Sequence, residues 1–175
     1  MFSTEIMSKI LFQSRGAWAK RASLRTVMNL HDYIIAMEGI DWRPLLALWT
    51  PPLPEKFALW FVNRFGDAFV ATPDGYIHHL DVGAGTCTMV ARSRDEFARS
   101  LDLPLYREKW LRLSAVDACL RSKIELARGE CYGFKIPPAL QGTYEVSNLV
   151  PTKLDAHYSW MSHLSRQDSI YWIEP

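Results

Sequence analysis

The sequence predicts an α+β protein with a mainly antiparallel sheet: a meander followed by a later hairpin, flanked by helices at N-terminal, middle and C-terminal positions. Between residues 67 and 91, short apolar stretches are separated by Pro73-Asp74-Gly75 and Gly83-Ala84-Gly85, which are turn-forming sequences. Helical patterns precede and follow this region, and strands do not alternate with helices as they do in a parallel sheet. These observations favour the α+β class.

The length of 175 residues corresponds to about one domain, and 49% hydrophobic with 22% charged residues is ordinary for a globular protein. Cys87, Cys119 and Cys131 are an odd number of cysteines without CxxC spacing. We therefore expect neither a disulfide framework nor a zinc site, and a reducing compartment fits best. No apolar run approaches the length that crosses a bilayer, so no membrane partner is expected.

Charge divides the chain into two unequal parts. Residues 1–27 hold five basic residues and one acidic residue, which leaves fifteen basic and eighteen acidic residues in 28–175. We interpret 1–27 as a basic N-terminal extension and 28–175 as a single α+β domain. The extension is expected to be an overextended gene start with Met28 as the natural beginning, a disordered or frayed segment, or a targeting peptide. The acidic body argues against direct nucleic-acid binding.

Three helices are predicted before the meander. Residues 29–38 form a short one, and residues 41–49 form a second with Asp41 as N-cap and Pro44 in its first turn. The third is predicted to open at Pro54 and to end at Gly66. It is predicted because four apolar residues fall at helical spacing: Leu53, Phe57, Trp60 and Phe61.

The meander is predicted to hold three antiparallel strands within residues 67–91. Successive side chains of a strand point to opposite faces. In the middle strand, one face therefore carries Tyr76, His78 and Leu80, and the other carries Ile77, His79 and Asp81.

Two helices are predicted after the meander. "SRDE" at 93–96 has the pattern of a capping box, in which Ser93 accepts from the amide of Glu96 and the glutamate reaches back. That helix is expected to run to about Leu101 and to bury Phe97. The next, capped at Ser114 and ended by Gly129, has a predicted apolar stripe of Val116, Leu120 and Ile124.

The last third of the sequence predicts a hairpin, a helix and a final strand. Residues 131–136 and 143–149 are predicted strands joined by 137–142, with Cys131, Gly133 and Lys135 on one face of the first. Residues 153–167 are predicted to be an amphipathic helix, and residues 169–173 a last edge strand. The buried stripe of the helix is predicted to be Leu154, Tyr158, Met161 and Leu164.

Catalytic and metal-binding patterns are weak. Cys131 is predicted to be structural, with the alternative that it is a nucleophile assisted by a distant histidine, which requires a lowered thiol pKa. His79 and Asp81 share a strand face, but two ligands do not make a metal site. His157 and His163 are six residues apart and miss the spacing that lets two histidines of one helix share a metal. No catalytic residue, metal or cofactor is predicted.

Four motifs occur in one order along the chain: "NRFGD" (63–67), "LDVGAG" (80–85), "GECYGFKIPP" (129–138) and "YEVSN" (144–148), followed by a late helix near His157. In these motifs the chain resembles a bacterial family of type VI secretion immunity proteins, related to the C-terminal domain of the antidote to a secreted DNase toxin. The resemblance covers about residues 32–167. It implies a sheet flanked by helices, no defined catalytic residue, and a cognate toxin as partner.

The first functional hypothesis is therefore a cytoplasmic immunity protein that binds and neutralises a secreted toxin, with a nuclease as the expected class, by occluding its active site. Immunity proteins gain specificity from shape and charge complementarity. The predicted partner-binding residues are polar or aromatic groups near turns: Asp74, Tyr76, His79, Asp81, Lys135, Gln141 and Tyr144. The alternatives are an orphan interaction module of the same family without a toxin, and a cysteine-dependent hydrolase that uses Cys131.

Overall fold

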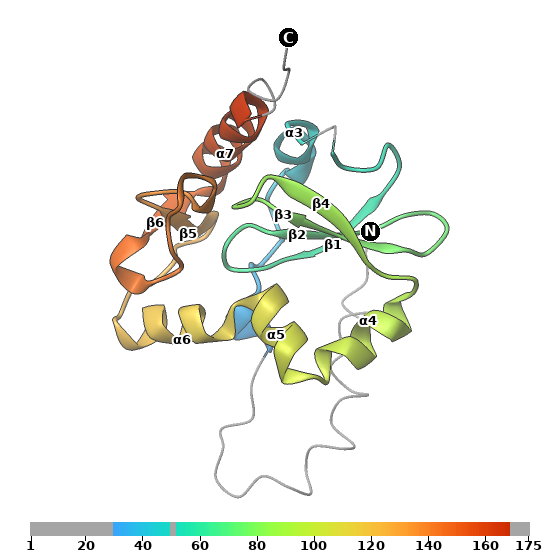
Figure 1. Cartoon of the computed structure of the whole chain (residues 1–175), viewed down its shortest axis with the longest axis horizontal. Coiled ribbons are helices and arrows are strands. Elements are labelled where there is room, and N and C mark those ends of the chain that lie inside the picture. Colours follow the sequence, from blue (N-terminus) through green and yellow to red (C-terminus); the bar gives the residue numbers. More distant parts are fainter. Residues whose placement is uncertain (1–29, 50–51, 169–175) are drawn as a thin grey trace, which may run out of the picture.

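The computed structural model describes residues 30–49 and 52–168 (Figure 1). The predicted extension 1–27 and the predicted strand 169–173 lie outside the described residues. In chain order the elements are η1 Leu30–Tyr33, α3 Trp42–Ala47, β1 Ala58–Val62, β2 Ala68–Ala71, β3 Ile77–Asp81, β4 Thr86–Ala91, α4 Arg94–Leu101, α5 Pro104–Leu111, α6 Leu113–Arg121, β5 Glu130–Phe134, η2 Pro138–Leu140, η3 Val146–Asn148, β6 Leu149–Lys153 and α7 Leu154–Asp168.

The strands form two antiparallel sheets, which confirms the predicted α+β class. The larger sheet has the order β1-β2-β3-β4, and the smaller one pairs β5 with β6. In Figure 1 the helices α4, α5 and α6 lie below the larger sheet, α3 and α7 lie above it, and the β5–β6 hairpin lies at one side. The predicted meander is confirmed as β2, β3 and β4.

The helix predicted from Pro54 to Gly66 is wrong, because residues 58–62 form strand β1. This strand pairs with β2 from Ala58↔Ala71 to Val62↔Ala68. The apolar spacing that indicated a helix arises because apolar side chains occur on both faces of the strand. Short apolar runs rich in aromatic and β-branched residues do not distinguish a buried strand from a helix. Sheet pairing decided the outcome.

The first predicted helix is also shorter than expected. Only Leu30–Tyr33 is helical, as a single 3₁₀ turn. The next residues are extended: Ile34 bridges Asn63, and the amide of Ile35 donates to the Val62 carbonyl at 2.9 Å. Tertiary pairing with the end of β1 therefore replaces the local helix. The second helix is confirmed as α3, with the Asp41 side chain accepting from the Arg43 amide.

An aromatic stack crosses the larger sheet and explains its core. Phe61, Phe69 and His79 are cross-strand neighbours, with ring centroids 4.4 Å apart for the first pair and 4.5 Å apart for the second. Phe97 of α4 and Trp110 of α5 stack on each other at 4.6 Å and contact Phe69 edge-on. Such aromatic burial is a large source of core stability.

The capping box at the start of α4 is confirmed. Ser93 accepts from the amide of Glu96 at 3.1 Å, while the Glu96 carboxylate accepts from the amide of Arg92. The predicted burial of Phe97 is confirmed. Helix α5, which begins at Pro104, was not predicted.

Helix α6 differs from its predicted form. It begins directly after Arg112, whose backbone is left-handed at φ 52°, and ends at Arg121, well before Gly129. Val116 is buried as predicted, but Leu120 is exposed and Cys119 takes the buried position. The buried face of α6 is thus rotated about the helix axis relative to the predicted apolar stripe.

In the β5–β6 hairpin, the second strand lies further along the chain than predicted. Residues 143–149 were predicted to be extended, but Val146–Asn148 is a 3₁₀ turn and the strand runs from Leu149 to Lys153. The first strand is confirmed, and both its faces are buried: Cys131 and Tyr132 are each almost inaccessible.

Helix α7 is confirmed, with Leu154, Tyr158 and Met161 buried and Leu164 partly buried. Among the described residues, no helix has both the length and the apolar character that a membrane span requires.

Candidate functional site

The turn at residues 63–67, between β1 and β2, is the point where the two sheets and two helices meet. Asn63 organises it: its Oδ1 accepts from the amides of Phe65 and Asp67, and its Nδ2 donates to Asp67 Oδ2 at 2.8 Å and to the Trp110 carbonyl at 2.9 Å. An asparagine suits such a turn because its amide carries both donors and an acceptor.

Other elements bond to the backbone of the same turn. The Tyr132 amide of β5 donates to the Arg64 carbonyl at 2.8 Å, and the Tyr158 hydroxyl of α7 donates to the Gly66 carbonyl at 2.7 Å. Gly66 has φ +85°, and a Cβ there would lie 3.1 Å from the His157 ring. The turn therefore needs glycine both for its backbone conformation and for the close approach of α7.

Asp67 is a fully buried carboxylate. It accepts from the Val82 amide at 2.9 Å and from Asn63, and its Oδ2 lies 3.8 Å from His79 Nε2. Burial alone would raise the pKa of Asp67, but His79, Arg112 and the Asn63 amide offset it and hold the pKa below its usual value. The carboxylate is thus held within the core by hydrogen bonds from Asn63 and Val82, with the His79 ring close to it.

Asp81, Arg112 and Tyr144 form a half-buried group beside Asp67. An Arg112 guanidinium nitrogen donates to Asp81 Oδ2 at 3.1 Å, and the guanidinium carbon lies 3.8 Å from the centre of the Tyr144 ring. This geometry combines an ion pair with a cation–π contact. Burial and the charge of Asp67 raise the pKa of Asp81, and they also raise the pKa of Tyr144.

The segment 135–148 between β5 and β6, here called the clasp loop, is closed by Asn148. The Asn148 Nδ2 donates to the carbonyls of Ile136 and Thr143 at 2.8 Å each, and its Oδ1 accepts from the Ile136 amide at 2.9 Å. The Lys135 ammonium donates to the Ser147 carbonyl at 2.6 Å. The loop is therefore a pre-formed structure.

Two large apolar side chains stand out from the clasp loop. Ile136 and Leu140 are each 53% exposed, although neighbouring Phe134 is buried. Gln141, also exposed, holds a left-handed backbone at φ 65°, and a Cβ at Gly142 would overlap the Ile136 carbonyl. Strained, well-determined loop positions of this kind are typical of functional surfaces.

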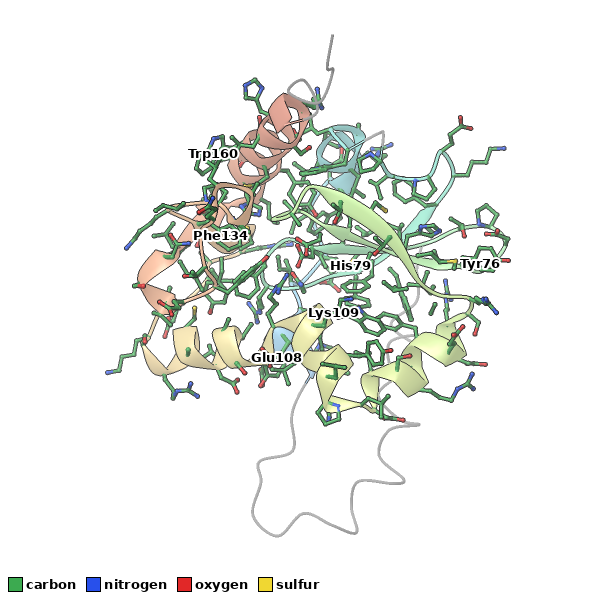
Figure 2. All side chains as sticks on the ribbon, in the orientation of Figure 1. Tyr76, His79, Glu108, Lys109, Phe134 and Trp160 are labelled. Carbon is green, nitrogen blue, oxygen red and sulfur yellow. The ribbon has the colours of Figure 1, made fainter. Side chains whose placement is uncertain are left out.

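The structure brings together only some of the predicted partner-binding residues. Asp81 and Tyr144 meet through Arg112, and Lys135, Gln141 and Tyr144 belong to the clasp loop. Asp74 and Tyr76 lie in the β2–β3 turn, and Figure 2 shows Tyr76 at the opposite end of the molecule from Phe134, which precedes the loop. His79 is buried against Phe69 and Asp67, so a partner does not reach it in this structure.

Cys131 lies in an environment that opposes nucleophilic chemistry. Its side chain is fully buried, and burial, followed by the charges of Asp67 and Glu130, raises the pKa of its thiol. A reactive cysteine needs the reverse shift. Among the described residues, no three histidine, cysteine, aspartate or glutamate side chains are placed to share a metal ion.

Two hollows in the surface are built mainly from apolar or small side chains. One, of about 30 Å³, is purely apolar and is lined by residues such as Leu30, Trp60 and Phe97. The other is an open groove of about 430 Å³ between Leu48 and the outer side of α7, beside the exposed Trp160. Neither is lined by Cys131, His79 or Asp81.

Sequence reasoning missed Asn63, Asp67, Arg112 and the buried His157. The first two were visible as ends of the "NRFGD" motif, since an Asn with an Asp four residues later is a turn-forming pair. Arg112 gave no local signal, because its partners are 31 and 32 residues away in sequence.

The fold and these contacts define an α+β scaffold with a buried polar centre at the 63–67 turn and a pre-formed loop at its surface. Residues 91–165 match the model of the family described as T6SS immunity protein Tdi1, C-terminal. The resemblance drawn from the sequence is thereby confirmed for the part from the end of β4 into α7, which is similar to this family. The motifs at 63–67 and 80–85 precede the matched span. No curated protein matches the chain.

Proposed function

We propose that this protein acts in the cytoplasm as an immunity protein: it binds a toxin of a type VI secretion system and neutralises it by occluding the toxin's active site. The match of residues 91–165 to an immunity family is the observation that carries this proposal. The internal pairing of Asp67 and Asp81 and the inert environment of Cys131 support binding rather than catalysis.

The clasp loop is the proposed contact surface for the toxin. Its exposed Ile136 and Leu140 supply apolar anchors, and Lys135 and Gln141 supply polar groups beside them. Because Asn148 already fixes the loop, little conformational entropy is lost on binding. A few buried anchors usually dominate the affinity of such interfaces.

A nuclease is the proposed class of toxin. Residues 28–175 carry three more acidic than basic residues, and a nuclease must present a basic groove to its substrate. Charge complementarity of this kind speeds association and suppresses wrong partners.

The test is protection and copurification with the product of the neighbouring toxin gene. The parent should form a complex and restore growth, and the double variant Ile136→Glu with Leu140→Glu should lose both. Leu120→Glu is a matched control, because Leu120 is similarly exposed at 49% but lies on α6. Failure of the parent to bind or protect against any neighbouring toxin contradicts the proposal, and equal loss in both variants moves the contact away from the loop.

The second candidate is an interaction module of the same family without a toxin. Gene neighbourhood separates the two: a gene far from secretion and toxin genes favours the orphan module.

A further inference from the structure

Strand β4 is an outer strand of the larger sheet, and among residues 30–49 and 52–168 its second edge has no strand partner. It pairs with β3 alone, from Asp81↔Thr86 to Ile77↔Ala91. Within the described part of the chain, no backbone hydrogen bond from any element other than β3 reaches residues 86–91. Thr86, Thr88 and Met89 are exposed, whereas Cys87 and Val90 are partly buried against the core.

The other outer strands of the described chain are bonded or protected at least in part. The end of β1 is bonded by Ile34 and Ile35. The Tyr132 amide of β5 donates to the Arg64 carbonyl, and β6 carries Pro151 and Lys153. Proline and lysine are devices by which natural proteins prevent strand pairing.

Strand β4 has none of these protections. Its sequence, Thr-Cys-Thr-Met-Val-Ala, contains no charge and no proline, although 22% of the whole chain is charged. The register is regular from Thr86 to Met89, and the irregularity comes only at the end, between Ile77 and His78 of β3. A regular, uncharged, open edge is a template for one more strand.

We propose that β4 is a self-association site, which pairs antiparallel with β4 of a second copy of this chain about a twofold axis at Cys87. In this register each Thr86 faces Thr88 of the other copy, and cross-strand threonine pairs are favourable. The two four-stranded sheets then continue as one. This interface does not depend on a toxin.

The charges around β4 favour a second copy over other partners. An antiparallel pair places the two exposed Arg92 side chains at opposite ends, so that they do not repel each other. Each Arg92 then lies opposite Val82 of the other copy, next to Asp81, whose carboxylate is already paired with Arg112. Isologous contacts with this twofold symmetry are the commonest in soluble oligomers. Because the strand is short, we expect a dimer with a dissociation constant on the order of micromolar.

The test measures the mass of the full chain by sedimentation and light scattering across concentrations that bracket the micromolar range. The parent should pass from monomer to dimer, and Thr88→Lys should remain monomeric because it places two ammonium groups in the centre of the pair. Leu105→Lys is the control, since Leu105 is exposed on α5, and it should dimerise like the parent. Circular dichroism and thermal unfolding check that both variants are folded.

A parent that stays monomeric throughout overturns the proposal, as does a Thr88→Lys variant that dimerises normally. Protection of β4 amides from hydrogen exchange only when a toxin is added would also overturn it, because the edge would then serve that partner.

The register has its own test. In the dimer, two Cys87 thiols lie opposite each other, and mild oxidation by dissolved oxygen removes two protons and two electrons to form one S–S bond. We expect a covalent dimer from the parent and none from Cys87→Ser. A dimer that oxidation leaves uncrosslinked contradicts the register centred on Cys87.

Discussion

Asn63 and Asp67 are joined by two hydrogen bonds, one between their side chains and one from the Asp67 backbone amide to the Asn63 side chain. Asn63 Nδ2 donates to Asp67 Oδ2 at 2.8 Å, and Asn63 Oδ1 accepts from the Asp67 amide at 3.0 Å. The same Asn63 amide reaches the Trp110 carbonyl of α5. A single side chain thus connects the β1–β2 turn, the buried carboxylate and a helix, which makes the turn a structural centre of the molecule.

Replacing Asn63 with alanine should destabilise the protein strongly. The change leaves several buried polar groups without partners, among them the Asp67 carboxylate and the Trp110 carbonyl, and should lower the free energy of unfolding by about 3 kcal/mol or more. Urea denaturation measures this. Asp74→Ala, in an exposed turn, is the control and should stay within about 0.5 kcal/mol of the parent. Similar losses in both variants would show that Asn63 has no special role.

Two glycines with similar backbones should differ in their tolerance of alanine. Gly66 and Gly75 have φ +85° and +91°, but only Gly66 has a close neighbour, because an added methyl group there would lie 3.1 Å from the His157 ring. Gly75→Ala should cost about 1 kcal/mol through backbone strain alone. Gly66→Ala should cost roughly 2 kcal/mol more, because α7 must also move. Thermal unfolding compares them, and equal costs would mean that the contact with α7 adjusts freely.

Removing the charge of Arg112 should destabilise the protein, because the Asp81 carboxylate then lacks its positively charged partner. Arg112→Met leaves Asp81 beside Asp67 without its cation and should destabilise the protein by about 2–4 kcal/mol. In a double-mutant cycle, Asp81→Asn should recover part of this loss, with a coupling energy of about 1–3 kcal/mol. Arg112→Lys keeps the charge and should lose less. Additive effects of Arg112→Met and Asp81→Asn would contradict the pairing.

Stability should fall with acidification between about pH 6.5 and pH 4 because of His157. Burial lowers the pKa of His157 from 6.5 to about 4, so in this window the unfolded chain binds a proton that the folded chain does not. Acid therefore favours unfolding. The free energy of unfolding should be about 3 kcal/mol lower near pH 4 than above pH 6.5. Asp67, with a lowered pKa, loses its contribution only at still lower pH, as pH falls through its folded value.

The measurement is the free energy of unfolding as a function of pH for the parent and His157→Leu. The variant should lose most of the decline between pH 6.5 and pH 4. The raised pKa of Asp81 acts in the opposite direction in both proteins, so their difference isolates His157. An unchanged slope in His157→Leu would assign the pH dependence elsewhere.

The three cysteines should react with a thiol reagent in a fixed order. Cys87 is partly exposed and should be labelled in the folded protein, whereas Cys119 and Cys131 are buried and should react only after unfolding. Mass spectrometry of peptides after labelling at neutral pH identifies the sites. Rapid modification of Cys131 in the folded state would revive the hypothesis of a cysteine-dependent hydrolase.

The local signals in the sequence were sufficient for the parts of the fold that depend on neighbouring residues. Asp41 and Ser93 identify helix starts because each cap bonds an amide two or three residues away. The turns around Gly75 and Gly83 give the meander, and the 3.6-residue spacing of apolar residues gives α7. Two of the four motifs, at 129–138 and 144–148, lie within the span 91–165 that matches the immunity family model.

Partners distant in sequence decided the rest. Residues 58–62 became a strand because β2 pairs along them and Ile35 bonds to Val62 at their end, which outweighed a helical apolar spacing. Arg112 and Tyr144 meet Asp81 only because the two sheets and α5 converge on the 63–67 turn. Burial of His79 and exposure of Ile136 likewise depend on which faces other elements cover. Capping, turns and periodicity are short-range interactions that the sequence by itself determines, whereas strand pairing, burial and charge pairing depend on tertiary contacts between distant segments.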